Sequence, residues 1–153
     1  MVCYTTPMKI IHTQDNFKTL SFAKGEEIMS VLKEYLTENN IHAAHIAGLG
    51  AADVVEIAYY NIKTKEYERH EISEAVEILN LNGNVGVKED GEVVVHMHGT
   101  FGRKDLSVFG GHIFAMRVSG AGEIHLRVFE GTIHRAYDEE TGLTLMCDVP
   151  ADV

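Results

Sequence analysis

The sequence predicts an α+β domain built on a mainly antiparallel β-sheet, with one main helix packed on it. Two observations point to this class. Most of the 153 residues fall into short segments rich in β-branched and aromatic side chains, whereas a single segment shows helical spacing of its apolar residues. The β-rich segments also follow one another without intervening helices, so we expect neighbouring strands to pair antiparallel through turns.

The first predicted elements are a strand and the helix. Residues 17–22 alternate apolar and polar side chains, as in a half-buried strand. The helix begins after Gly25, where Glu26 and Glu27 suit the positive end of the helix dipole, and it ends at Asn39-Asn40. Its predicted buried face has i, i+3, i+4, i+7, i+8 spacing and comprises Ile28, Val31, Leu32, Tyr35 and Leu36.

The rest of the chain is predicted to consist of strands. Residues 41–50 and 53–60 have the composition of two strands with a bend at Gly48-Leu49-Gly50. Residues 138–142 have the composition of a turn that leads into the last strand. The remaining predicted strands, in order, are residues 67–72, 76–87, 92–101, 113–118, 123–129 and 143–147.

The composition is that of a globular protein, with 45% hydrophobic and 24% charged residues. No apolar run approaches the roughly 20 residues needed to cross a bilayer. The first residues contain no basic region followed by an apolar stretch, so we expect no secretory signal and a cytoplasmic location. Cys3 and Cys147 are then expected to be reduced thiols.

The charge balance argues against nucleic acid as a direct partner. The net charge is −10, from 23 acidic and 13 basic residues, whereas proteins that grip DNA carry a basic face. The longest basic cluster, Arg103-Lys104, is followed at once by Asp105. The same argument disfavours binding to an anionic membrane surface.

Three histidines form the most informative pattern. His96 and His98 are two residues apart in a predicted strand, so they project from the same face. Gly110-Gly111 precedes His112, and two glycines let a backbone pass close to a neighbouring strand. If the two strands pair as a hairpin, His112 lies beside the other two. Three imidazoles with a fourth position open are typical of a catalytic zinc site, and imidazole also suits nickel, copper and iron.

A simpler interpretation of this pattern stays open. The chain has nine histidines, so some pairs at i, i+2 arise by chance. Two histidines on one strand face can also be a hydrogen-bonded surface pair with no ion between them.

Two further polar residues are candidates for the same site. Glu77, between Val76 and Ile78, could hold a histidine tautomer or act as a general base beside metal-bound water. The alternative is an outward-facing residue on an alternating strand. Arg117 could bind a substrate carboxylate or an acid at an interface, and the alternative is an exposed arginine on the sheet.

Four segments, taken in order, resemble the plants-and-prokaryotes-conserved (PPC) domain family. They are AAHIAGLGA at residues 43–51, VEILNLNGN at 76–84, HMH at 96–98 and GGH at 110–112. Each segment is short, but their order and spacing together are specific to this family. The resemblance covers about residues 17–129, most of the chain.

The resemblance implies one PPC-like domain over residues 1–153, with its core at about 17–129 and a C-terminal extension at 130–153. It implies an α+β fold that assembles as a homotrimer. It also implies that His96, His98 and His112 cluster around a divalent transition metal, with zinc as the first candidate.

The chain departs from the plant members of the family in two places. It has no AT-hook, the Gly-Arg-Pro core that enters the minor groove. Plant domains carry Gly-Arg-Phe-Glu-Ile-Leu for contact with transcription factors, and residues 74–79 here are EAVEIL. Only the second half of that motif is kept, which argues against direct DNA binding and against that partner interface.

Three functions follow as hypotheses. The first is a regulatory or binding module, a trimer that binds metal and regulatory protein partners, with any DNA role indirect. The second is a metal-dependent enzyme that acts on a small molecule, and the third is a structural trimer. A pocket with an open ligand position and convergent polar groups would favour the second over the first.

Overall fold

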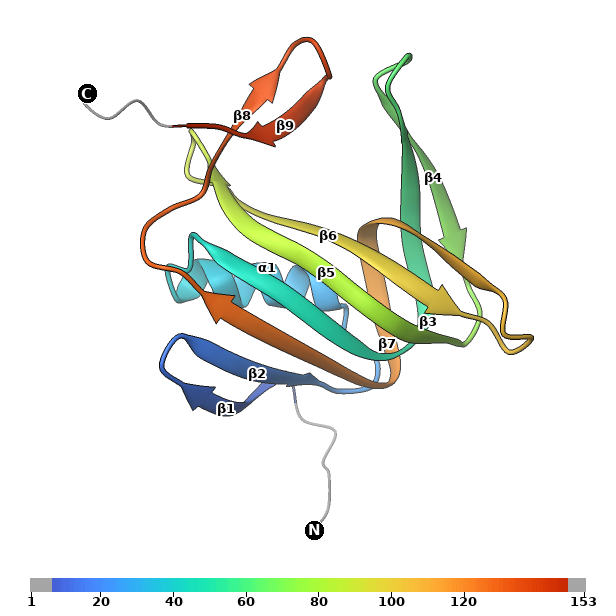
Figure 1. The fold of residues 1–153 in the computed structure, drawn as a ribbon. Helices are drawn as coiled ribbons and strands as arrows, with labels where there is room; N and C mark the ends of the chain where they lie inside the picture. The colour runs from blue at the N-terminus through green and yellow to red at the C-terminus, as the bar shows by residue number, and fades with distance from the viewer. Residues whose placement is uncertain (1–6, 149–153) are drawn as a thin grey trace.

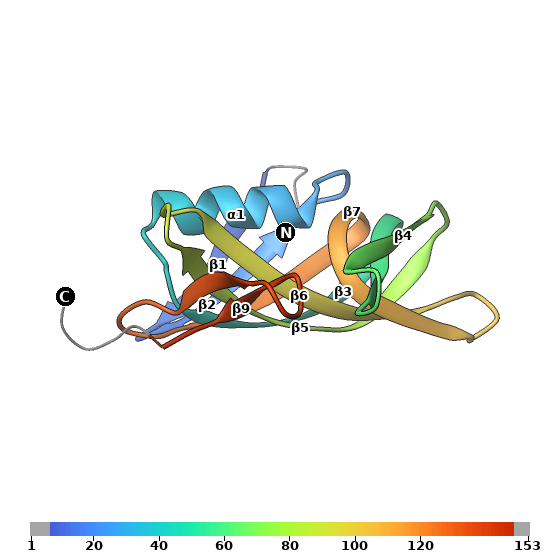
Figure 2. The same cartoon turned by 90° about the horizontal axis from the view of Figure 1, so that it is seen from above.

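A computed structural model describes residues 7–148 as one nine-stranded sheet with a helix along one face (Figure 1, Figure 2). The predicted α+β class and the mainly antiparallel pairing are confirmed, and only the pairing of β5 with β8 is parallel among the described strands. The elements are β1 (Lys9–Gln14), β2 (Phe17–Phe22), α1 (Ile28–Glu38), β3 (Ala44–Asn61), β4 (Glu66–Ile72), β5 (Val76–Lys88), β6 (Val93–Gly102), β7 (Val108–Val128), β8 (His134–Asp138) and β9 (Leu143–Met146).

Four strands in the middle of the sheet pair in a closed circuit. The main path runs β1-β2-β7-β3-β5-β8-β9, while β4 pairs with β3 and β6 pairs with both β5 and β7. Strands β7, β3, β5 and β6 therefore each have two neighbours in that circuit. The strands that carry the three histidines, β6 and β7, belong to this central part of the fold.

The hydrophobic core lies between α1 and the sheet. The helix buries Ile28, Leu32, Tyr35 and Leu36, four of the five residues predicted for its inner face. Val31 is only partly buried and packs at the margin of the core. The sheet contributes fully buried side chains that include Leu20, Phe22, Ile46, Leu81, Met97 and Phe101.

Glu27 caps the helix and also ties it to β7. Its carboxylate accepts hydrogen bonds from the backbone N–H groups of Met29, Ser30 and Met116. The first two are helix donors that would otherwise lack partners, which is the usual role of a cap residue. No helix in the part of the chain from residue 7 to residue 148 is long and apolar enough to span a membrane.

Two predicted breaks in the sheet are wrong. Strand β3 is continuous through Gly48 and Gly50, with a shift in its register against β5 instead of a bend between two strands. Gly50 has φ of 151°, and a Cβ there would lie 2.2 Å from the carbonyl oxygen of Ala121, so only glycine fits this bulge. Strand β7 likewise runs unbroken through the region between the predicted strands 113–118 and 123–129.

Two strands were not predicted. Strand β1 is exposed at every position and therefore lacks the apolar alternation that marks a strand in sequence. Strand β8 is short and pairs with β9, so the C-terminal extension forms a hairpin around the predicted turn. The predicted thiol Cys147 is free and exposed, and Cys3 lies outside the described residues.

Candidate metal centre and adjoining groove

The β6–β7 hairpin brings the three predicted histidines together. His98 on β6 pairs in register with His112 on β7, and His96 lies two residues before His98 on the same strand face. The two glycines before His112 allow the close approach to neighbouring strands that the sequence predicts. A Cβ at Gly110 would lie 2.5 Å from the carbonyl oxygen of Gly99, and one at Gly111 would lie 2.8 Å from that of Ala58.

The three imidazoles are within reach of one ion. One nitrogen from each ring lies within 4.8 Å of the other two. The ring centroids of the three pairs are 5.2, 5.1 and 5.3 Å apart. Tetrahedral zinc at about 2.0–2.1 Å from each nitrogen sets its ligand nitrogens roughly 3.4 Å apart, so the nitrogens need to approach one another by at most about 1.4 Å.

The electrostatics of the cluster favour the neutral form of His96 and His112, which is the form that binds a metal. Burial, followed by the charges of the neighbouring His96, His98 and Arg69, lowers the pKa of His112 to about 4. Burial also lowers the pKa of His96, followed by the positive charge of Arg135 and by His98. The Nδ1 atom of His112 is buried and has no hydrogen-bond partner among the described residues. The donor set therefore fits a divalent transition metal.

Arg135, which the sequence did not single out, is the buried charge beside this cluster. It is 4% exposed, and it extends from β8 towards β6. Its Nη1 donates to the carbonyl oxygen of Thr144 over 3.0 Å, and its Nη2 donates to Oδ1 of Asn84 over 2.5 Å. The same Nη2 lies 3.4 Å from Nδ1 of His96. Since a guanidinium only donates, this contact requires the lone pair of His96 Nδ1 to face Arg135.

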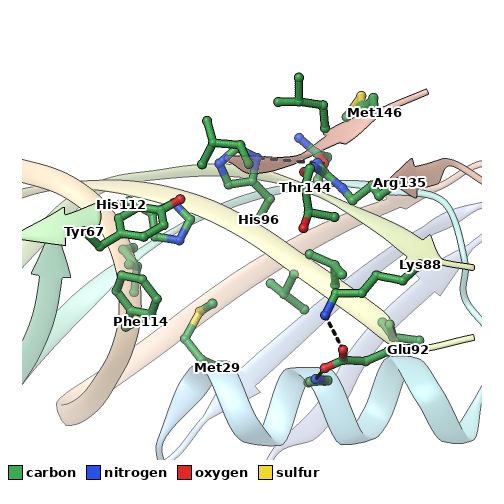
Figure 3. Close-up of a pocket in the computed structure, with 18 of the residues that line it drawn as sticks. Met29, Tyr67, Lys88, Glu92, His96, His112, Phe114, Arg135, Thr144 and Met146 are labelled. Atoms are coloured by element: carbon green, nitrogen blue, oxygen red, sulfur yellow. Dashed lines mark hydrogen bonds and ion pairs between the residues drawn. The ribbon is translucent and has the colours of Figure 1, made fainter. Parts of the chain in front are cut away.

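A groove of about 810 Å³ extends from the histidines (Figure 3). His96 and His112 line one part of it, and Arg135 with Thr144 and Met146 of the C-terminal hairpin lines another. The aromatic wall consists of Tyr67 and Phe114, whose ring centroids each lie 4.9 Å from that of His112. The guanidinium of Arg69 stacks on the outer side of this wall, 3.6 Å from the Phe114 centroid.

The tips of two hairpins meet beside the groove. The hydroxyl of Tyr60, at the end of β3, donates to the carbonyl oxygen of Thr141 in the β8–β9 turn over 2.6 Å. Lys65, in the turn before β4, donates to the carbonyl oxygen of Glu139 over 2.6 Å. The C-terminal hairpin is thus held at its tip as well as at its base.

His98 faces a second, smaller hollow. This hollow has a volume of about 280 Å³ and is lined also by Asn80, Asn82 and Thr100. His98 is exposed, whereas His96 and His112 are partly buried. The cluster therefore lies between the large groove and this shallow polar hollow.

The other two predicted site residues lie elsewhere. Glu77 is exposed on the outer face of β5, while its neighbours Val76 and Ile78 are buried, so the simpler outward-facing interpretation fits it. Arg117 is exposed and forms a 2.7 Å ion pair with Asp53 on β3. Neither residue lines the groove described above, because the period-2 alternation of β5 and β7 turns them to other surfaces.

The residues missed by sequence reasoning come from the extension, from β4 and from β7. Arg135 and Tyr67 lie far from the histidine motifs in sequence, whereas Phe114 is two residues after His112 on β7 and therefore shares its strand face. One signal was present for β8. The predicted turn at 138–142 and the predicted strand after it imply a partner strand before the turn, and that partner carries Arg135.

Comparison with known proteins gives one family and several similar structures. The model of the Plants and Prokaryotes Conserved (PCC) domain matches residues 12–130. A search of curated proteins gives no match.

Three solved structures illustrate the similarity. A candidate DNA-binding protein from Bacteroides thetaiotaomicron is 30% identical, with a TM-score of 0.88 over 93% of this chain and 98% of that one. A metal-containing protein from Archaeoglobus fulgidus is 34% identical, with a TM-score of 0.80 over 92% and 99%. A plant- and prokaryote-conserved protein from Pyrococcus horikoshii is 26% identical, with a TM-score of 0.80 over 96% and 99%.

Proposed function

The chain belongs to the Plants and Prokaryotes Conserved domain family, and on that premise we propose that it is a metal-binding module. His96, His98 and His112 hold one divalent transition-metal ion, with zinc as the first candidate. The observation that carries this proposal is the convergence of three imidazoles at the end of a large groove. When bound, such an ion supplies positive charge and an open coordination position to a small molecule in that groove.

Two findings support the metal. The similar Archaeoglobus protein is described as metal-containing, and it is 34% identical over 92% of this chain. The buried Nδ1 of His112 has no partner among residues 7–148, and a buried polar atom without a partner marks a site that something else satisfies. A closed structural zinc site would need a fourth protein ligand, whereas the cluster offers three.

Direct binding to DNA is not part of this proposal, although the Bacteroides relative is described as a candidate DNA-binding protein. The net charge is −10, and the side chain of Arg103 in the longest basic cluster is paired with Glu74 over 2.7 Å. Any regulatory role therefore acts through the ligand of the groove and through protein partners. Binding to duplex DNA should be weak at physiological salt.

A metal-dependent enzyme is the second candidate. The observation that favours it is the groove itself, because a module that only binds metal needs no cavity of about 810 Å³ beside its ligands. Turnover of a small molecule by the metal-loaded protein, lost in the histidine variant below, would establish it. Binding of the small molecule without turnover would favour the metal-binding module instead.

Homotrimer formation is also proposed, on the basis of the family. Large apolar side chains are exposed near the turn between β6 and β7 and on the adjoining end of β5, and association would cover them. These side chains are Leu79, Leu106 and Val108, which are 51%, 87% and 58% exposed. Sedimentation equilibrium should give a mass of three chains, and a monomer would contradict the proposal.

The test of the metal is elemental analysis of tag-free protein. We expect about one ion per chain in the natural sequence and none in a His96→Ala/His98→Ala/His112→Ala variant. The matched control removes three histidines outside the site, His12, His70 and His125, and should retain the ion. If the natural protein binds no metal while the triple variant stays folded, the proposal is wrong.

A further inference from the structure

The buried cation Arg135 has no negative partner among the described residues. It is 4% exposed, and its hydrogen bonds go to a backbone carbonyl and to the amide oxygen of Asn84, which are neutral acceptors. None of the ion pairs formed by residues 7–148 includes it. Buried charges are normally paired, because an unpaired charge in a poorly solvated site is costly.

A purely structural role would not require a charge at this position. The oxygens of Asn84 and Thr144 each need only an N–H donor, which a neutral side chain can supply. What a guanidinium adds is a permanent positive charge and a planar set of donors suited to a carboxylate. Its position in the wall of the groove makes that charge available to a ligand (Figure 3).

Metal binding would leave one donor of Arg135 without its present partner. If Nδ1 of His96 binds the ion, the lone pair that now faces Arg135 is used. If Nε2 binds it, the proton of the neutral ring must sit on Nδ1, and two donors then face each other across 3.4 Å. In either case Nη2 loses this contact, and a second positive charge is added nearby.

The acidic side chains that line the same groove are already engaged. Glu27 accepts from three backbone N–H groups at the start of α1 and on β7. Glu92 is held between Lys33 and Lys88. The groove therefore contains an uncompensated positive centre made of Arg135 and the ion site, within a chain whose net charge is −10.

The rest of the lining is largely apolar. Tyr67 and Phe114 form one wall, Met29 lies at the side of the helix, and Leu143 and Met146 belong to the C-terminal hairpin. A ligand that fits these surroundings has one negative end and an apolar or aromatic body. A volume of about 810 Å³ accommodates a small organic molecule.

We propose that the groove binds an organic monocarboxylate, with its carboxylate between Arg135 and the ion held by the three histidines and its apolar body against Tyr67 and Phe114. This inference rests on the proposed metal site for the second contact of the carboxylate. Arg135 supplies the first contact from the protein itself. The two contacts make metal and carboxylate binding mutually reinforcing, because the negative carboxylate offsets the positive charge that the ion adds beside Arg135.

The experiment is isothermal titration of three carboxylates, benzoate, phenylacetate and hexanoate, into zinc-loaded and metal-free protein. The corresponding alcohols, benzyl alcohol, 2-phenylethanol and hexanol, match their shape without the charge. We expect at least one carboxylate to bind the zinc-loaded protein at least about tenfold more tightly than its alcohol, since each hydrogen bond to a charged group is worth about that factor or more. The same carboxylate should bind metal-free protein more weakly.

Variants at position 135 test whether Arg135 makes the contact with the carboxylate. Arg135→Gln keeps donors for Asn84 and Thr144 without the charge, and it should weaken carboxylate binding by at least about tenfold while leaving alcohol binding unchanged. Arg135→Lys keeps the charge and should fall between the two. The control Arg127→Gln removes an exposed sheet arginine on β7 and should change nothing. If thermal unfolding shows that Arg135→Gln does not fold, Arg135→Lys and the carboxylate–alcohol comparison carry the test.

The outcomes separate this inference from the metal proposal. Carboxylates that bind no better than their alcohols, or equally well to Arg135→Gln, would overturn the inference even if elemental analysis finds one ion per chain. Absence of metal would overturn the proposed function alone, provided that a carboxylate still binds metal-free protein in a way that depends on Arg135. Absence of any carboxylate binding up to about 10 mM overturns the inference in both cases.

Discussion

The candidate site is built from two hairpins that differ in how they are held. The β6–β7 hairpin carries the three histidines, and both of its strands lie in the closed circuit of pairing at the centre of the sheet. The β8–β9 hairpin carries Arg135 and joins the sheet through two parallel register pairs, Val87 with His134 and Lys88 with Arg135. The remaining attachment of the second hairpin is polar.

This difference separates two tasks within one site. Metal ligands need fixed positions, and the β6–β7 hairpin receives them from backbone pairing on both sides and from the core beneath. A ligand-binding wall benefits from some freedom to adjust, and segments with few buried apolar contacts open at low free-energy cost. We expect the β6–β7 hairpin to unfold only with the whole domain and the β8–β9 hairpin to open on its own.

The largest expected effect is on the β6–β7 hairpin. Phe101 is 0% exposed and stacks on Phe109 with 5.3 Å between ring centroids. Phe101→Ala leaves a cavity beneath the hairpin and should lower the free energy of unfolding by about 3–5 kcal/mol, measured by urea denaturation. Lys104→Ala, at an exposed position in the turn of the same hairpin, should cost less than about 0.5 kcal/mol. Equal costs for both would show that the buried ring of Phe101 does not stabilise the β6–β7 hairpin.

Removal of the metal should have the next largest effect. With zinc at about 100 times its dissociation constant, the ion adds about 2.7 kcal/mol to the free energy of unfolding, and a chelator should remove this amount. Hydrogen exchange should localise the change, with amides of β6 and β7 protected by the ion more than those of β9. Uniform protection over both hairpins would contradict the separation of tasks.

Loss of the contact at the hairpin tips should have a smaller, local effect. Tyr60→Phe removes the hydroxyl that donates to Thr141 and should cost about 1 kcal/mol. Amide exchange should accelerate in β8 and β9 and stay unchanged in β6. Tyr59→Phe, at a 67% exposed position beside it, serves as the control and should have no effect. Faster exchange in β6 would show that the two hairpins open together.

The smallest expected effect concerns acid. Lys33 and then Lys88 lower the pKa of Glu92 from 4.5 to about 2, so its ion pairs stabilise the fold fully above pH 4.5 and lose their contribution as the pH falls towards 2. Because the Glu92 side chain is 42% exposed, the contribution should be only about 0.5 kcal/mol. Glu92→Gln should remove this part of the acid dependence in urea titrations between pH 5 and pH 2. An unchanged slope would show that these ion pairs contribute nothing.

Features that depend on neighbouring residues in the sequence could be predicted, whereas contacts between distant segments could not. His96 and His98 share a face because of strand geometry alone, and the glycines before His112 indicated the close approach that brings it alongside. The helix and most strands were predicted for the same reason, since their apolar spacing is local.

The rest of the site depends on contacts between distant segments. Arg135 meets Asn84 across 51 residues and His96 across 39, and no local pattern marks such a meeting. Glu77 and Arg117 were candidates because of their residue types, yet the direction of a side chain on a strand depends on pairing and bulges that composition does not reveal.

The long strand β7 also determines when the protein can fold during synthesis. Its C-terminal half pairs with β2, where Phe17 lies opposite Arg127, so the β1–β2 hairpin has no partner strand in the sheet until about a hundred residues have followed it (Figure 1). The ribosome must therefore release most of the chain before the first hairpin can join the sheet. Such a topology folds slowly and leaves unpaired strands exposed on the nascent chain. Chaperones that bind extended apolar segments would then act on β2 and α1 before β7 emerges.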